Sequence, residues 1–183
     1  VTVASAVLLS SLSYQSPRNR VVMIDGEFPS IRYVYESLGA RLGAQVVTVP
    51  SPEGDGLTAD SERIADAIDD RTALVAISHV LFKSAFVIDF LPIAERCRKV
   101  GALLALDAYQ SVGTLPVDVG ALDADALVGG VLKWLCGGPG GAFLYVRPEL
   151  RARLSPALTG WMAHPAPFAV APPPIRLRDD RFR

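Results

Sequence analysis

Short apolar runs alternate with longer amphipathic segments along most of this chain. The runs are rich in β-branched residues, which favour strands. They cover Val21 to Ile24, Gln45 to Val49, Ala73 to Ser78, Ala102 to Asp107, Ala126 to Gly129 and Ala142 to Val146. The helix-length segments are Ser30 to Leu42, Thr58 to Ile68 and Phe90 to Val100. This alternation predicts an α/β fold, in which a mostly parallel sheet is flanked by helices on both faces.

Local signals refine this prediction at four places. The connection before Ala142 to Val146 is too short for a crossover, so we expect this strand to be antiparallel. Thr58 and Asp60 are plausible caps of the second helix, and Pro92 suits the first turn of the third. The amino-terminal stretch Val1 to Tyr14 is predicted to be strand-like and then helical.

Composition excludes several classes of function. With 183 residues, 50% of them hydrophobic and 20% charged, the chain can bury one substantial core. With a net charge of −1, the chain has no excess of positive charge that would indicate binding to nucleic acid. Val1 to Tyr14 is too short to span a membrane. Cys97 and Cys136 lack metal-ligand spacing, so we expect no metal site and reduced thiols in the cytoplasm.

Lys133 is the most unusual charged residue of the chain. It is one of three lysines, against fifteen arginines, and it follows the apolar run Leu127 to Leu132 and precedes the glycine cluster 137–141. A buried ammonium group there would lose most of its hydration, which favours the neutral, nucleophilic amine of a Schiff-base lysine. The alternative is that Lys133 lays its methylene groups along apolar surface while its amine reaches water.

Asp107 ends another apolar run and gives Lys133 a partner. Open α/β sheets bind ligands at the carboxyl ends of their strands, and the two residues are 26 positions apart (133 minus 107) on neighbouring predicted elements. Such a pair suits pyridoxal phosphate, whose aldehyde a lysine holds as an imine while a carboxylate keeps the ring nitrogen protonated. A purely structural ion pair is the alternative.

Around these residues the sequence resembles the class V aminotransferase family of fold type I pyridoxal-phosphate enzymes, which includes kynureninases and cysteine desulfurases. The matching stretches are Leu106 to Gly113, Pro116 to Val119, Leu132 to Gly140, Glu27 to Ser30 and Thr159 to His164. The blocks around the aspartate and the lysine are the specific ones. The resemblance implies a transferase or lyase that acts on an amino acid or similar amine.

The resemblance also implies roles for individual residues. Lys133 is similar to the lysine that binds the cofactor and carries protons, and Asp107 to the partner of the pyridine nitrogen. Gln110 stands where desulfurase-like members hydrogen-bond the ring hydroxyl, although an ordinary turn residue is an alternative. Members often place a serine and a histidine, or a tyrosine, just before the lysine to hold phosphate, where this chain has Gly130 and Leu132.

Three further residues are weaker candidates for the cofactor site. Phe28 matches an aromatic residue that stacks on the cofactor ring in kynureninase-like members, or is simply part of the core. Ser5 stands where a helix start would receive the phosphate, or is only a helix cap. Trp161 lies in a block that resembles the kynureninase tryptophan segment and is expected to line the same pocket.

The ends of the chain suggest how its domains are organised. We expect residues 1–164 to form the cofactor-binding large domain, incomplete at its amino terminus, and residues 165–183 to be a connector toward a missing carboxy-terminal small domain. By analogy, the full-length protein is expected to be a homodimer with a small-molecule substrate. Two alternatives remain: an inactive remnant of the fold that serves as an interaction or dimerisation module, and a nucleotide-binding domain, against which the missing phosphate fingerprint speaks.

Overall fold

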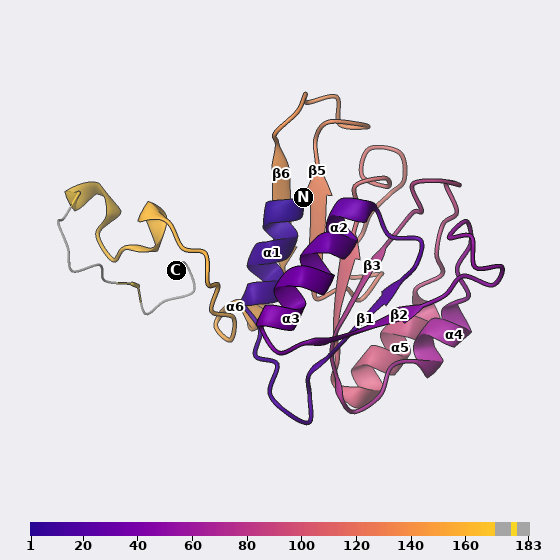
Figure 1. The fold of residues 1–183 in the computed structure, drawn as a ribbon. Helices are drawn as coiled ribbons and strands as arrows, with labels where there is room; N and C mark the ends of the chain where they lie inside the picture. The colour runs from indigo at the N-terminus through magenta and orange to yellow at the C-terminus, as the bar shows by residue number, and fades with distance from the viewer. Residues whose placement is uncertain (171–176, 179–183) are drawn as a thin grey trace.

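The computed structural model describes residues 1–170 and 177–178, and a six-stranded sheet forms its centre (Figure 1). The strand order is β2-β1-β3-β4-β5-β6, and every neighbouring pair is parallel except β5 and β6. The strands are β1 (Arg20–Ile24), β2 (Gln45–Val49), β3 (Thr72–Ser78), β4 (Leu103–Asp107), β5 (Ala126–Gly130) and β6 (Ala142–Val146). The expected α/β fold and its antiparallel last strand are confirmed.

Helices cover both faces of the sheet, as the alternating pattern predicts. On one face, α4 (Ser61–Asp66) and α5 (Leu91–Val100) bury residues such as Ile64 and Ile93 against the strands. On the other face lie α1 (Thr2–Ser10), α2 (Pro29–Tyr33), the π-helical turn η1 (Val34–Leu38) and α3 (Gly39–Arg41). Leu9 and Tyr35 belong to the core of this second face. The central strands are therefore buried on both sides, which explains their continuous apolar runs.

Two expected boundaries differ from the observed ones. The amino-terminal stretch forms α1 and contains no strand, and Leu8 and Leu9 of this helix are buried in the core of the second face. The helix expected from Thr58 begins only at Ser61. Asp60 is its N-cap, with a carboxylate that accepts hydrogen bonds from the backbone N–H groups of Glu62 and Arg63. Thr58 lies before the cap.

The chain beyond β6 contributes little to the sheet. Its described residues form α6 (Pro148–Arg151) and two 3-10 turns, η2 (Trp161–Ala163) and η3 (Pro167–Ala169). In Figure 1 the last of these, drawn in yellow, stand away from the sheet. Most of the connector expected over 165–183 lies outside the described residues, since 171–176 and 179–183 are not among them. Among the described helices, none is both long and apolar enough to cross a membrane.

Candidate active site

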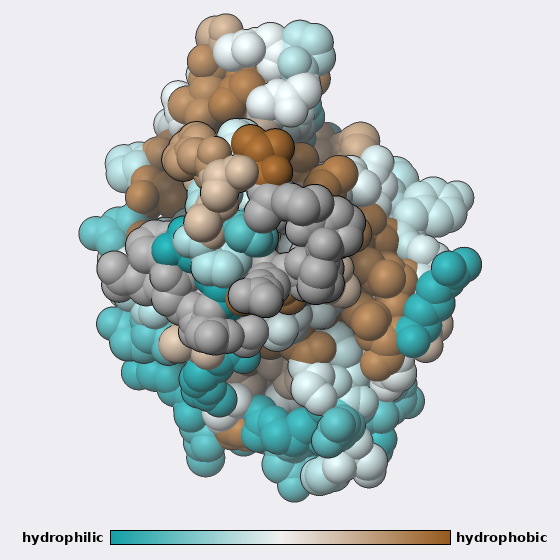
Figure 2. Space-filling model, turned by 90° about the vertical axis from the view of Figure 1, so that its left-hand side faces the viewer, coloured by the Kyte–Doolittle hydropathy of each residue, from teal (hydrophilic) through white to brown (hydrophobic). Residues whose placement is uncertain are grey.

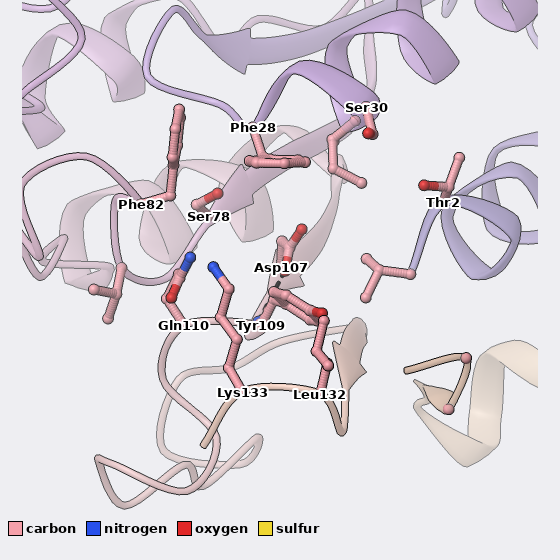
Figure 3. A pocket seen from close by; sticks show the side chains of 15 residues that line it. Thr2, Phe28, Ser30, Ser78, Phe82, Asp107, Tyr109, Gln110, Leu132 and Lys133 are labelled. Carbon is pink, nitrogen blue, oxygen red and sulfur yellow. Dashed lines mark hydrogen bonds between the residues drawn. The ribbon is translucent and has the colours of Figure 1, made fainter. Parts of the chain in front are cut away.

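A cavity of about 310 Å³ opens at the carboxyl-terminal edge of the sheet. Its walls come from the ends of β3 and β4, the loops after β4 and β5, and the beginnings of α1 and α2. The side chains that line it and carry polar groups or rings are Thr2, Phe28, Ser30, Ser78, Phe82, Asp107, Tyr109, Gln110 and Lys133 (Figure 3). Segments far apart in the sequence thus meet at the edge where open α/β sheets bind ligands.

Asp107 is the last residue of β4 and is 9% exposed. Its Oδ1 accepts a hydrogen bond of 2.8 Å from the backbone N–H of Tyr109. Burial raises the pKa of the Asp107 carboxyl to about 6, whereas this hydrogen bond and the positive charges of the amino terminus and of Lys133 lower it. The carboxylate therefore still ionises below neutral pH and can accept a hydrogen bond from a cationic ring.

Lys133 reaches the same cavity from the loop that follows β5, the strand next to β4. Of the two alternatives that the sequence offers, the structure shows the one in which the amine reaches water: Lys133 is exposed, because β5 ends at Gly130 and the next residues form a loop over the edge of the sheet. Its Nζ lies 5.2 Å from the centroid of the Tyr109 ring, a cation–π contact. The amine is thus both accessible and held beside Asp107.

Gln110 and Phe28 are the other expected residues that line the cavity. Gln110 follows Asp107 in the loop after β4, and in Figure 3 its amide points to the same space as the Lys133 amine. Phe28 precedes α2, is 44% exposed, and packs edge-on against Phe82 with 5.2 Å between the ring centroids. Two aromatic rings therefore form one wall of the cavity.

Ser5 and Trp161 do not line this cavity. Ser5 is one turn into α1, where its backbone N–H already donates to the Val1 carbonyl, and it is 1% exposed. Its amide is therefore not free to receive a phosphate at the helix start. Trp161 is 57% exposed in η2, packs edge-on against Phe168 and donates its indole N–H to the Pro167 carbonyl. Neither residue therefore lines the cavity that Asp107 and Lys133 share.

Sequence reasoning missed four polar residues of the cavity. Ser78 ends β3 and lies beside Asp107 in the strand register, so the same argument from strand ends would have found it. Tyr109 lies inside the motif that contains Asp107 and Gln110. Thr2 and Ser30 are at helix starts, and their hydroxyl groups lie on the side of the cavity nearest α1 and α2 (Figure 3). No local pattern marks Thr2 and Ser30 as neighbours.

Two glycines let the loops around Lys133 approach each other. A Cβ atom at Gly130 would lie 2.0 Å from Cε2 of Tyr109, so the Tyr109 ring occupies the space that a side chain at position 130 would need. Gly113 has a φ of +95°, and a Cβ atom there would lie 2.8 Å from the carbonyl oxygen of Trp134. The loop after β4 and the loop after β5 are therefore packed backbone to backbone.

The comparisons with known proteins agree with this geometry. The family model for aminotransferase class-V matches residues 2–164. An uncharacterized aminotransferase, YcbU of Bacillus subtilis, is 36% identical over 151 residues, which are 82% of this chain and 39% of that protein. A kynureninase of Burkholderia mallei is 32% identical over 169 residues, or 91% of this chain and 39% of that protein. The chain thus spans about two fifths of the length of these relatives.

Solved structures show the same fold. A mutant of C-DES with glycine covalently linked to its PLP cofactor superposes with a TM-score of 0.81 at 24% identity, covering 100% of this chain and 48% of that one. The apo cysteine desulfurase of Thermococcus onnurineus gives a TM-score of 0.75 at 22% identity, over 89% of this chain and 40% of the desulfurase. At this level of identity the likeness is one of fold.

Proposed function

The chain belongs to the aminotransferase class-V family, and from this premise we propose that it is the cofactor-binding part of a pyridoxal-phosphate-dependent enzyme that acts on an amino acid or a similar amine. One observation carries the proposal: Asp107, at the end of β4, and Lys133, in the loop after the adjacent strand β5, line the same cavity. The reaction is of the transferase or lyase type. Aminotransferase and kynureninase relatives support both.

The residues that line the cavity fit the cofactor. When bound, pyridoxal phosphate supplies an aldehyde for covalent attachment and a pyridine ring that accepts electrons from the substrate. Lys133 would provide the amine for attachment, and Asp107 the buried carboxylate for the ring nitrogen. Gln110 would donate to the ring hydroxyl, and Phe28 would pack against the ring. The Thr2 and Ser30 hydroxyls would take the phosphate, in place of the side chains that Gly130 and Leu132 lack.

Two groups of this chain would handle protons during the reaction. Asp107 stays ionised at neutral pH and would hold the proton on the ring nitrogen, which keeps the ring cationic. Lys133 would take a proton from the substrate carbon at its Nζ and return it. Tyr109, whose ring lies under Nζ, would orient the amine in both roles.

We also infer a homodimer and a cytoplasmic location. Leu132, Trp134 and Leu135 are 48%, 53% and 43% exposed beside the lysine, and apolar side chains grouped this way are typical of interfaces. A second copy of the protein would bury them and close the cavity from that side. The thiols of Cys97 and Cys136 are both free, which suits a reducing compartment.

A cofactor titration tests the proposed function. Adding pyridoxal phosphate to the purified protein is expected to produce a visible absorbance band that borohydride converts into a stable adduct. Lys133→Ala should abolish both band and adduct, whereas Lys83→Ala, which removes another exposed lysine, should leave both unchanged. A folded protein without a Lys133-dependent adduct would contradict the proposal and favour an interaction module.

A further inference from the structure

A second, much smaller cavity adjoins the first at Asp107. Its volume is about 10 Å³, enough for one water molecule. Four polar residues line it from four different elements or loops, namely Ser5, Glu27, Tyr35 and Asp107, and most of the remaining lining is apolar. Asp107 therefore lines both the larger cavity and this small one, which is called the void below.

The Ser5 hydroxyl group needs a hydrogen-bond partner, and the void beside it can provide one. Its side chain is 1% exposed, and its Oγ has no hydrogen-bond partner among the described residues. Buried hydroxyl groups are nearly always paired with protein or with an ordered water. Because Ser5 lines the void, a water molecule placed there would satisfy this hydroxyl.

Glu27 is the most deeply buried carboxyl group that lines the void, at 2% exposed. Its Oε1 accepts a hydrogen bond of 2.7 Å from the backbone N–H of Ser78, and its Oε2 lies 2.6 Å from the Ser78 hydroxyl. Burial raises the pKa of Glu27 to about 8; the Ser78 hydrogen bonds lower it, the charge of Asp107 raises it, and Arg32 lowers it. Glu27 therefore carries a proton at neutral pH.

The other titratable groups around the void leave this assignment unchanged. Burial raises the pKa of the Tyr35 phenol well above its usual value, and the charges of Tyr14, Glu27 and Asp107 raise it further, so Tyr35 stays neutral. Burial likewise raises the pKa of Tyr14. The Asp107 carboxyl, with a pKa of about 6, loses its proton first. At neutral pH one carboxyl of the pair is ionised and the other is not.

We propose that the void holds one water molecule that links the Glu27 carboxyl to the Asp107 carboxylate and also hydrogen-bonds the Ser5 hydroxyl, which makes Glu27 a positioning residue for Asp107. The functional importance of Asp107 rests on the proposed function. The water gives the Asp107 carboxylate a donor on the side away from the open cavity, in addition to the Tyr109 N–H. A neutral Glu27 adds no second negative charge at this place.

Carbon-13 NMR of the side-chain carboxyl groups tests the proton assignment in the cofactor-free protein. In the wild type, the Asp107 carboxyl is expected to titrate near pH 6, which is called the lower step, and the Glu27 carboxyl near pH 8, the upper step. Glu27→Gln should remove the upper step while keeping an acceptor for the Ser78 N–H. Asp107→Asn should move the upper step to lower pH, because the negative charge that opposes ionisation of Glu27 is gone.

A matched control is Glu62→Gln, which changes an exposed glutamate of α4 and should leave both steps in place. An upper step that survives Glu27→Gln, or that Asp107→Asn leaves unmoved, would overturn the inference. If Glu27→Gln does not fold, comparing the upper step of the wild type with that of Asp107→Asn still tests the inference.

Thermal unfolding supplies an independent pH profile. A carboxyl group whose pKa is higher in the folded than in the unfolded state stabilises the folded protein at pH values below the unfolded-state pKa. This contribution is lost as the pH rises through the folded-state pKa, which is about 8 for Glu27. The melting temperature of the wild type should therefore fall over this range. Glu27→Gln should flatten the profile, and a profile parallel to that of the wild type would count against the inference.

A high-resolution crystal structure tests the water itself. The wild type should show one ordered water in contact with Ser5, Glu27 and Asp107. Ser5→Thr, whose additional methyl group fills the void, should exclude it, and a dry void in the wild type would overturn the inference. These cofactor-free measurements stand apart from the proposed function, which fails instead if no Lys133-dependent adduct forms.

Discussion

Gly130 determines the shape of the cavity wall beside the lysine. Because it has no side chain, the Tyr109 ring can lie directly against the end of β5, and that ring lies 5.2 Å from Lys133 Nζ. A small residue at the end of the strand therefore accommodates a large one in the neighbouring loop.

A side chain introduced at position 130 should clash with the Tyr109 ring. Gly130→Ala is expected to lower the free energy of unfolding by about 1–3 kcal/mol, because its Cβ overlaps the Tyr109 ring. Urea denaturation measures the loss. In the double variant with Tyr109→Ala, the clash is absent. The effects of the two substitutions on the free energy of unfolding should therefore be clearly non-additive.

Gly160→Ala is the control for this prediction. No atom lies within 4 Å of the position that its Cβ would take, so its stability should stay near that of the wild type. If Gly130→Ala were as stable as Gly160→Ala, the contact between Tyr109 and position 130 would not exist in solution.

Among the residues of the site, the sequence indicated those whose position follows from a strand end. Asp107 and Lys133 follow adjacent apolar runs, so their convergence could be predicted from the parallel sheet alone. Thr2, Ser30 and Glu27 could not be found this way, because only the packing of α1 and α2 against the sheet brings them to Asp107. The sequence left the exposure of the lysine open, since an apolar run does not show where its strand ends.

At the scale of elements, the start of α4 depends on one carboxylate. Asp60 accepts hydrogen bonds of 3.1 and 3.2 Å from the first backbone N–H groups of the helix. Asp60→Ala should therefore lower the free energy of unfolding by about 1 kcal/mol. Thr58→Ala, which removes the other expected cap, should have almost no effect, and equal losses in chemical denaturation would contradict this assignment.

All six strands could be predicted from the sequence to within about one residue, because each is a short apolar run, and the central strands are also buried on both faces. Helix boundaries were less certain. Thr58 and Asp60 are both residues that cap helices, and only the geometry of the loop selects Asp60. In α1, the apolar residues spread over more than one side, so the local pattern did not separate a helix from a strand.

At the scale of the whole molecule, apolar surface gathers at two places. One is the loop with Leu132, Trp134 and Leu135, and the other is the carboxy-terminal segment, where Trp161 and Phe168 are 57% and 78% exposed. Figure 2 shows the side of the molecule on which this segment lies, and brown, apolar atoms are visible on that side. A monomer of this size rarely exposes so many large apolar side chains, which agrees with the proposed dimer.

A charge placed in the loop beside Lys133 should weaken the dimer. Leu135→Glu is expected to shift sedimentation velocity from dimer toward monomer, because the buried carboxylate would have no partner. Leu91→Glu is the matched control, since Leu91 is 64% exposed at the start of α5. Dimers that persist equally in both variants would place the interface elsewhere.

The contact between Gly113 and Trp134 limits how this sequence can change in length. Because the two backbones touch there, the segments from Asp107 to Gly113 and from Gly130 to Trp134 each need a fixed number of residues. Between them, residues 116–120 form a largely exposed loop. Insertions and deletions among proteins of this kind should therefore accumulate in that loop, where they alter the spacing between the aspartate and the lysine in sequence but not in space.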